Sequence, residues 1–187
     1  MKKLINDEMS LRIVQTAEKL VTEDGIETLN VSKILRELNI TNRVFYNRFN
    51  NIEDVLNEVY NNIILQIRET ITPDYDGKQD FFEYVLDIIT NSLMLSYDLK
   101  MKFNLYIFGN DSLSESNYQW YISRIKQLIK YARDNDLVKD FDDDAMSYAI
   151  WCACRGFNAD AVMRIEKEEA IKRFRHSFKF LLDGIKK

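Results

Sequence analysis

The chain has 187 residues, of which 46% are hydrophobic and 30% charged. This composition is that of a globular protein and excludes a disordered or collagen-like chain. Only five glycines and one proline occur, too few for the many tight turns of an all-β protein or for a glycine-rich phosphate loop. The net charge of −4 excludes a uniformly basic nucleic-acid-binding surface. We therefore expect an all-α protein of long helices joined by short polar links.

The sequence offers little for catalysis or metal binding. His176 is the only histidine, so a Ser-His-Asp triad has one possible base, with no carboxylate near it in sequence, and a multi-histidine metal site is excluded. Cys152 and Cys154 are two residues apart, and on a helix their side chains point about 200° apart. They are therefore interpreted as two packed thiols and not as a metal or redox pair. We predict no enzyme activity, no metal and no cofactor.

Targeting signals are also missing from the sequence. Residues 1–19 mix charged and apolar side chains and do not resemble a signal peptide. The longest apolar stretches are four or five residues, too short to span a membrane. Together with two unpaired cysteines, this predicts a cytoplasmic protein without a membrane partner.

Three short helices are predicted first, over residues 8–24, 31–38 and 42–49. Gly25 follows the first, because glycine tolerates the left-handed backbone after a last helical turn. Asn30 and Thr41 are suitable N-caps for the second and third. Together these helices form a predicted domain over residues 1–51.

A larger helical body is predicted over residues 52–187. It begins with a long helix at 52–71, which ends before the turn-forming residues of 72–77. Apolar periodicity then predicts helices at 79–96, 99–108, 115–135, 142–165 and 168–185. The total is nine helices.

The most informative segment runs from residue 30 to residue 54. Two short helices joined by a few residues have the arrangement of a helix-turn-helix, whose second helix enters the major groove of DNA. Its exposed positions are predicted to be Asn42, Arg43, Tyr46, Asn47 and Arg48. Asparagine and arginine can read base edges, and a tyrosine hydroxyl can bind a phosphate oxygen. The alternative is a polar surface helix that Phe45 and Phe49 merely pack in place.

Further residues favour the first interpretation. In order, they are Ile13, Val14 and Ala17 in the first helix, Gly25, the Asn30–Val31–Ile34 group, Ile40–Thr41, the run from Phe45 to Phe49, and the acidic pair Glu53–Asp54. This pattern resembles the DNA-binding region of the tetracycline-repressor (TetR) family of bacterial transcription regulators. The match covers about 45 residues, whereas the rest of the chain fits in length and helical content alone.

The resemblance implies that five residues face DNA, namely Thr41, Asn42, Arg43, Tyr46 and Asn47, and that Lys33 lies near the DNA backbone. The chain departs from the family pattern at three positions. Ile52 stands where a phosphate-binding lysine is frequent, Arg43 where a glycine is common, and Asn39 at the turn glycine. These departures concern the operator sequence and the affinity.

The resemblance also implies that the body forms a two-fold dimer. Small residues lie along one side of the helix at 142–165, and apolar residues recur at steps of three and four along the last helix. The predicted interface comprises Ala149, Ala153, Gly156, Ile171, Phe174, Phe178, Leu181 and Ile185. Packing within one chain would give the same stripe and is the alternative.

A small-molecule effector is the third implication. The middle of the body is rich in aromatic residues, which are typical of ligand cavities. The candidate pocket residues are Phe103, Tyr106, Tyr118, Tyr121, Tyr148 and Trp151, although each could equally belong to an ordinary core. An apolar or amphipathic effector would suit them.

We therefore expect a homodimeric regulator, a repressor, that binds a palindromic site on double-stranded DNA and is released by its effector. The alternative is a DNA-bound adaptor of the same fold that recruits a protein partner and binds no small molecule.

Overall fold

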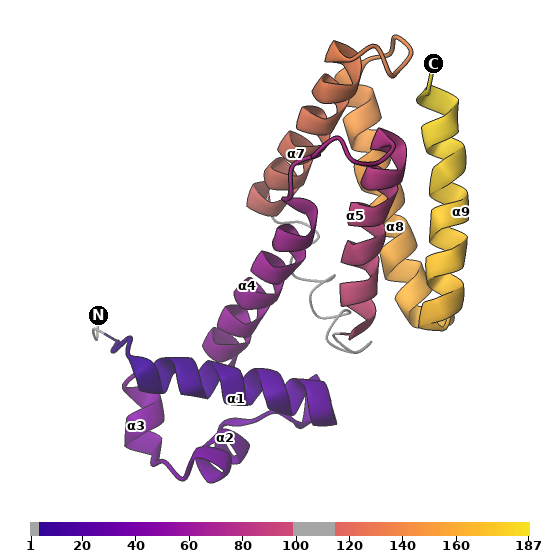
Figure 1. The fold of residues 1–187 in the computed structure, drawn as a ribbon. Helices are drawn as coiled ribbons and strands as arrows, with labels where there is room; N and C mark the ends of the chain where they lie inside the picture. Colours follow the sequence, from indigo (N-terminus) through magenta and orange to yellow (C-terminus); the bar gives the residue numbers. More distant parts are fainter. Residues whose placement is uncertain (1–3, 99–114) are drawn as a thin grey trace. The chain divides into compact units, whose positions relative to one another are not determined.

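The computed structural model describes residues 4–98 and 115–187, and within these ranges it is helical throughout, with no β-strand (Figure 1). The expectation of an all-α protein is confirmed. The helices are α1 (Glu8–Asp24), the 3₁₀ turn η1 (Ile26–Thr28), α2 (Val31–Leu38), α3 (Asn42–Tyr46), α4 (Ile52–Ile71), α5 (Phe81–Asp98), α7 (Glu115–Asp134), α8 (Asp143–Arg164) and α9 (Lys167–Ile185). The predicted helix at 99–108 lies outside the described residues. None of the helices in these ranges is long and apolar enough to cross a membrane.

Local signals explain where the first helices begin and end. Asp7 caps α1, accepting a hydrogen bond from the Ser10 amide, and the Ser10 hydroxyl in return accepts one from the Asp7 amide. Gly25 ends α1 with a φ of 89°, a conformation that costs glycine little. The Asn30 side chain caps α2 by accepting from the Lys33 amide. These short-range bonds satisfy helix-end amides that would otherwise lack partners.

The chain divides into two compact units, Met1–Gln66 and Ile67–Lys187, and the division falls within α4. In the amino-terminal unit, α1, α2, α3 and the first part of α4 share an apolar core. Its most deeply buried side chains are Ile13, Ala17, Ile34, Phe45, Val55 and Val59, each 0% exposed. The unit thus buries one face of every short helix and leaves the opposite faces in solvent.

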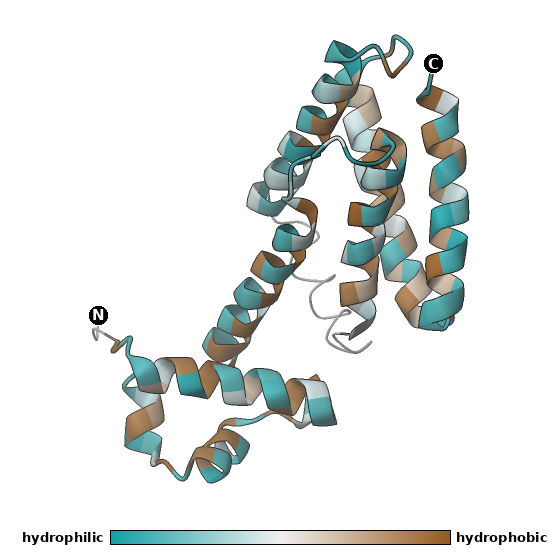
Figure 2. Ribbon diagram, viewed as in Figure 1, coloured by the Kyte–Doolittle hydropathy of each residue, from teal (hydrophilic) through white to brown (hydrophobic). Residues whose placement is uncertain are grey.

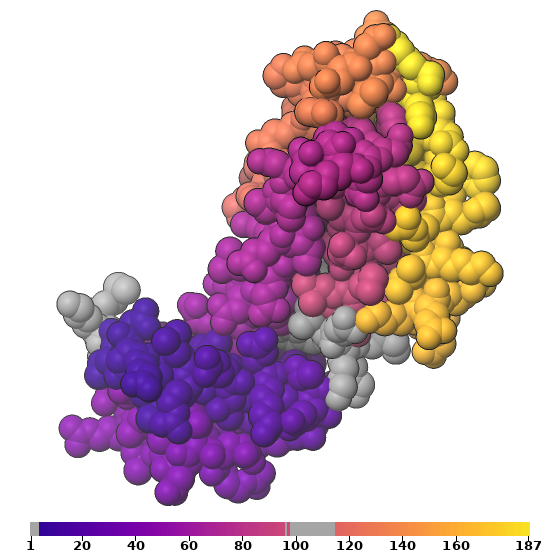
Figure 3. All heavy atoms as spheres, in the orientation of Figure 1, coloured from indigo at the N-terminus to yellow at the C-terminus, as the bar shows by residue number. Residues whose placement is uncertain are grey.

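The carboxy-terminal unit is built from two closely packed helix pairs, α5 with α9 and α7 with α8. The surface of α9 runs alongside that of α5 on the face shown in Figure 3. Apolar and polar residues alternate along α9 at helical spacing (Figure 2). Its buried residues are Ala170, Phe174, Phe178 and Leu182, a strict four-residue repeat that faces the interior of the unit.

This repeat corrects part of the predicted dimer interface. Phe174 and Phe178 are 2% and 4% exposed. Their ring centroids lie 4.8 Å apart, and those of Phe157 and Phe174 lie 5.0 Å apart. Both phenylalanines therefore belong to the core of their own chain and are not available to a partner. A helix with apolar residues at steps of three and four carries two adjacent stripes, and the sequence did not distinguish the inner stripe from the outer one.

Arg124 of α7 closes the carboxy-terminal end of α4. Its guanidinium donates to the carbonyl oxygens of Ile71, Thr72 and Pro73 at 3.0, 3.1 and 2.8 Å. The last carbonyls of a helix have no partner within the helix, so Arg124 satisfies the Ile71 and Thr72 carbonyls, and the Pro73 carbonyl accepts from the Tyr84 hydroxyl as well. The Arg124 side chain is only 12% exposed, and α4 and α7 are thereby joined.

Candidate functional site

The helix-turn-helix is formed by α2 and α3, joined at Asn39. Asn39 has φ 52° and ψ 47°, the left-handed conformation that asparagine tolerates better than most residues. It replaces the glycine of the family pattern without changing the turn. The α3 helix covers Asn42–Tyr46 and is thus shorter than the predicted 42–49.

Two phenylalanines hold α3 against the core of the amino-terminal unit. Phe45 is 0% and Phe49 is 7% exposed, and their ring centroids lie 5.9 Å apart. On the other side of the helix, Thr41, Asn42 and Arg43 are exposed, and Tyr46 is 44% exposed. The structure therefore brings four of the predicted DNA-facing residues onto one solvent-exposed face.

The predicted cap of α3 has a different role from the one expected. Thr41 occupies the N-cap position, but its side chain makes no hydrogen bond to the helix amides. The Thr41 carbonyl instead accepts from the amides of Val44 and Phe45. The hydroxyl group on the exposed face is therefore not used in capping the helix.

Arg48 is not a free DNA-binding side chain. Its Nε and Nη2 atoms donate to the two carboxylate oxygens of Asp7 at 2.8 and 2.5 Å, and Nη1 donates to the Val44 carbonyl. The side chain is 13% exposed. The hydrogen bond to Arg48 holds the pKa of Asp7 well below its usual range. Arg48 thus fastens the segment after α3 to the N-cap of α1, and its guanidinium is not the free DNA-facing group that was predicted.

The remaining two predicted DNA residues are partly engaged. Asn47 is half-buried, and its carbonyl accepts from the Ile5 amide at 2.9 Å. Lys33 Nζ donates to Asp24 at 2.6 Å and to the Thr28 hydroxyl at 3.1 Å. A phosphate would have to compete with the Asp24 carboxylate for this ammonium group.

A polar bridge after α3 was not predicted from the sequence. The backbone amide and side-chain amide of Asn50 both donate to Asp54, at 2.9 and 2.7 Å, and Asn51 accepts from the Asp54 amide at 2.8 Å. These bonds fix the turn that joins α3 to α4. They also give a structural reason for an acidic residue at the start of α4, which the sequence suggested through the pair Glu53–Asp54.

The amino-terminal unit is similar to a known family of proteins. Residues 13–59 match the family model described as bacterial regulatory proteins of the tetR family. Over these residues the chain is similar to the tetR family of regulators. The α2–α3 pair, the helix-turn-helix, lies within the matched residues. No curated protein matches the chain.

Solved structures extend the likeness of fold to nearly the whole chain. A tetR-family transcriptional regulator from Pectobacterium atrosepticum has a TM-score of 0.78 and 14% identity, with 96% of this chain and 94% of that chain covered. SmeT, the repressor of the Stenotrophomonas maltophilia multidrug efflux pump SmeDEF, has a TM-score of 0.72 and 14% identity over 95% and 90%. A regulator from Saccharomonospora viridis in complex with choline has a TM-score of 0.74 and 15% identity over 97% and 100%.

The structure gathers half of the predicted pocket residues into one aromatic cluster. The Trp151 ring lies 5.0 Å from Tyr121 and 6.1 Å from Tyr118, and Trp120 lies 5.0 Å from Tyr121. Tyr148 is 57% exposed and stands at the surface of α8. Phe103 and Tyr106 lie outside the described residues.

Two polar residues beside this cluster were missed. Arg68 of α4 lies over the Trp120 ring at 4.9 Å and donates through Nη2 to Asn117 of α7 at 2.8 Å. Asn117 is only 5% exposed. A signal was present in the sequence, since Arg68 follows the buried Ile64 by four residues and so continues an apolar stripe with a charge.

The outer side of α8 and α9 retains part of the predicted interface. Ala149, Gly156 and Leu181 are exposed, whereas Ala153, Ile171 and Ile185 are half-buried. Phe180, which was not predicted, is 67% exposed. A Cβ atom added at Gly156 or at Gly184 would meet no atom of the chain within 4 Å. Another helix therefore has space to approach α8 and α9 at these glycines.

In the parts of the chain that the structure describes, no group of three or more His, Cys, Asp or Glu side chains is placed to hold a metal ion.

Proposed function

We propose that this chain is a homodimeric repressor that binds a palindromic operator and is released by a small effector. The observation that carries the proposal is the face of α3, where Thr41, Asn42, Arg43 and Tyr46 are exposed above a buried Phe45. A short helix held from below by aromatic packing can enter the major groove with its polar side toward the base edges. Asn42 and Arg43 would read bases, and Thr41 and Tyr46 would bind phosphates. SmeT gives a precedent for repression within this fold.

The outer face of α8 and α9 supports a two-fold dimer. Large apolar side chains at Phe180 and Leu181 are 67% and 48% exposed, next to glycines that leave room for a second helix. Burying such side chains against a partner is favourable, because each removes apolar area from water. A two-fold dimer presents two recognition helices, which suits a site with half-sites about 34–36 Å apart.

The effector would bind at the aromatic cluster of Tyr118, Tyr121 and Trp151. The complex of the Saccharomonospora viridis regulator with choline is a precedent for a small ligand on this fold. Helix α4 contains residues of both units, so a ligand that changes its contacts with α7 would alter the DNA-binding unit as well. Such a ligand releases DNA only to the extent that it binds the two arrangements with different affinity.

Selection of bound sequences from a random DNA pool tests the DNA-binding part of the proposal. The expected product is an inverted repeat whose half-sites are separated by about one helical turn or a multiple of it. Enrichment of a single, asymmetric half-site would contradict the two-fold dimer. A reporter gene placed behind the selected site then distinguishes a repressor from an activator, because repression requires lower expression when the protein is present.

A further inference from the structure

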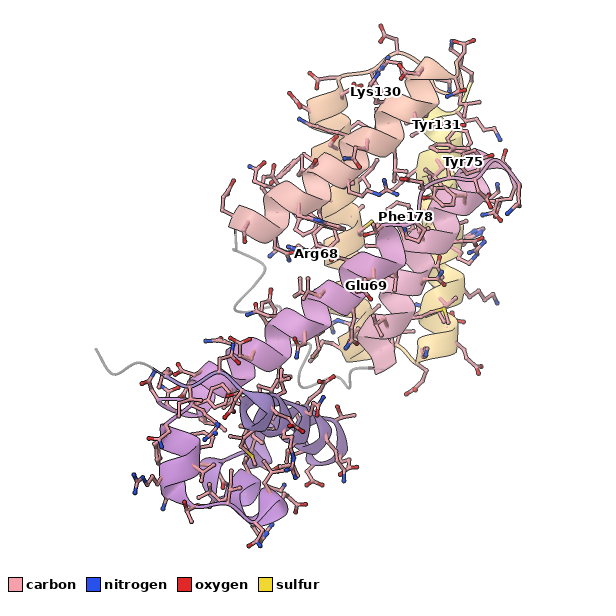
Figure 4. All side chains as sticks on the ribbon, turned by 60° about the vertical axis from the view of Figure 1, so that its left-hand side comes forward. Arg68, Glu69, Tyr75, Lys130, Tyr131 and Phe178 are labelled. Carbon is pink, nitrogen blue, oxygen red and sulfur yellow. The ribbon has the colours of Figure 1, made fainter. Side chains whose placement is uncertain are left out.

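Among the described residues, no carboxylate balances the positive charge of Arg68. Its guanidinium makes one hydrogen bond, from Nη2 to Asn117 Oδ1, and rests on the Trp120 ring. The Nε atom is buried and has no hydrogen-bond partner. Within residues 4–98 and 115–187, no carboxylate forms an ion pair with it. Figure 4 shows Arg68 on the carboxy-terminal part of α4, beside α7.

Arg124 of α7 lies at the same end of α4 but has several hydrogen-bond acceptors and a carboxylate nearby. That guanidinium donates to three backbone carbonyls and to the side chains of Gln127 and Tyr84, and it lies 3.5 Å from Asp74. Arg68 has one acceptor where Arg124 has many. A buried donor without a partner is costly, and a partly buried cation without a counter-charge adds to that cost. The folded protein therefore retains the free-energy cost of an unpaired guanidinium at Arg68, whereas the acceptors around Arg124 remove that cost there.

The surroundings of Arg68 are aromatic. Trp120 contacts Tyr121, and Tyr121 contacts Trp151, each with ring centroids 5.0 Å apart. A second arginine, Arg155, lies over the Trp151 ring at 5.7 Å. The cluster therefore combines aromatic surface with positive charge at both ends. This combination suits a ligand that has an apolar ring or chain and a negative group, and it disfavours a cation.

We propose that the Arg68–Trp120 cluster, meaning Arg68, Asn117, Trp120, Tyr121 and Trp151, recognises an organic carboxylate with an aromatic or aliphatic body. The proposal rests on the proposed effector function and assigns the chemical class of the effector. The carboxylate accepts from Nε and Nη2 of Arg68 together, the side-on pairing for which a guanidinium is shaped. Nη2 must then leave Asn117.

This exchange links the ligand to α4. The hydrogen bond from Arg68 to Asn117 connects α4 with α7, and the carboxylate replaces it with a bond to the ligand. The connection between the two helices through Arg124 is left in place. The ligand thus removes one hydrogen bond from the end of the helix that continues into the DNA-binding unit.

Tryptophan fluorescence gives a direct measurement of binding at this cluster. The chain has two tryptophans, Trp120 and Trp151, and both belong to the cluster, so a change of emission on titration reports on this place. The full-length protein would be titrated with a panel of arylalkanoates and fatty acids, such as 4-phenylbutanoate and decanoate, each paired with its neutral primary amide. The amide has the same size and apolar body but no charge.

The wild-type protein is expected to bind at least one carboxylate about tenfold or more tightly than its amide, as for a charge-assisted bidentate pair. Arg68→Gln keeps a side chain that can bond to Asn117 but removes the charge, and it should abolish this preference. Arg68→Lys, which keeps the charge without the fork, should retain part of it. Arg164→Gln is the matched control, because Arg164 is 73% exposed and pairs with Asp160 on its own helix.

The outcomes separate the two proposals. If amides and carboxylates bind equally, and Arg68→Gln changes neither, the effector site stands and the carboxylate assignment is overturned. If no carboxylate alters the fluorescence, but a neutral compound releases DNA, the conclusion is the same. If no compound alters either fluorescence or DNA affinity, the effector function falls and this inference falls with it. Circular dichroism and a melting curve for each variant confirm that it is folded.

Discussion

Arg48 and Asp7 are 41 positions apart in the sequence, yet the Arg48 guanidinium donates to both oxygens of the Asp7 carboxylate. The same carboxylate caps α1 by accepting from the Ser10 amide at 3.0 Å. The Asp7 side chain thus caps α1 and also anchors Arg48, which follows α3. The position of the proposed DNA-reading face therefore depends on a residue that does not itself lie on that face.

Removing the charge of Asp7 should weaken both the DNA-binding unit and its affinity for DNA. Asn is also a good N-cap, so Asp7→Asn retains the cap of α1 and loses the pair with Arg48. We expect a lower melting temperature and weaker operator binding, and a larger loss for Asp7→Ala, which removes the cap as well. Thermal melts and fluorescence anisotropy on the selected operator measure the two effects. Equal DNA affinity in all three proteins would show that the pair does not position α3.

The dependence on pH follows from the direction of the pKa shift. Because Arg48 lowers the pKa of Asp7 in the folded protein, the pair contributes stability that is fully present above the unfolded pKa of about 3.9. It is lost as the pH falls below that value toward the folded pKa. The stability difference between wild type and Asp7→Asn should therefore be constant near neutral pH and shrink below about pH 4. A difference that persists unchanged in acid would contradict the ion pair.

The exposed face of α3 should matter for DNA binding and not for folding. Arg43→Ala is expected to cost about 1–3 kcal/mol of specific binding energy if Arg43 reads a base. Tyr46→Ala should weaken binding without changing its salt dependence, because an uncharged hydroxyl releases no counterion from a phosphate. Neither should change the free energy of unfolding by more than about 0.5 kcal/mol, because surface positions rarely do. Lys19→Ala, on the exposed side of α1 with Glu23 as its partner, is the control. Unchanged footprints for both variants would exclude this face.

The sequence predicted best those features that are decided locally. Helices α1, α2 and α4 begin and end at the predicted residues, because their caps and stops lie within three or four residues of the ends. The left-handed turn at Asn39 is equally local. The helix-turn-helix followed from these elements together with the aromatic residues that hold α3.

Features that depend on distant partners could not be predicted in the same way. Nothing near Arg48 in the sequence indicates that Asp7 neutralises it, so the sequence predicts an exposed, unpaired cation at this position. Phe174 and Phe178 lie inside because α5 and α8 cover them, and periodicity along α9 alone gives no sign of this. Arg68 and Asn117 are 49 positions apart, and their meeting depends on how α4 packs against α7.

The bridge formed by Arg124 should be a main source of stability in the carboxy-terminal unit. Arg124→Met leaves the carbonyls of Ile71 and Thr72 without this donor, whereas the Pro73 carbonyl keeps the Tyr84 hydroxyl. We expect a loss of about 2–4 kcal/mol in the free energy of unfolding. Arg124→Lys should recover little of it, since an ammonium cannot reach three carbonyls in one plane. Lys130→Met on the same helix, where Lys130 is 74% exposed and pairs with Asp134, should change stability by less than about 0.5 kcal/mol. Urea denaturation compares the three, and similar midpoints would refute the capping role.

Gly156 provides a test of the proposed dimer that does not disturb the monomer. A Cβ atom added there meets no atom of another part of the chain within 4 Å, and replacing a helical glycine by leucine favours the helix by roughly 0.5–1 kcal/mol. Gly156→Leu should therefore fold at least as stably as a monomer but obstruct a helix that approaches α8 closely. Sedimentation should show monomers, with Lys130→Leu remaining dimeric as the control for an added apolar side chain. Dimers in both variants would place the interface elsewhere.

The two cysteines allow the same interface to be followed chemically. Cys152 is exposed on α8, whereas desolvation of the Cys154 thiol raises its pKa to about 12. At pH 8 only about one Cys154 in ten thousand is then the reactive thiolate, so an alkylating reagent should modify Cys152 alone. Because the proposed dimer covers this side of α8, labelling of Cys152 should be slow in the wild-type dimer and faster in the Gly156→Leu monomer, with Cys152→Ser as the blank. Mass spectrometry of the tryptic peptide gives the rate, and equal rates in dimer and monomer would mean that the dimer leaves this face of α8 open.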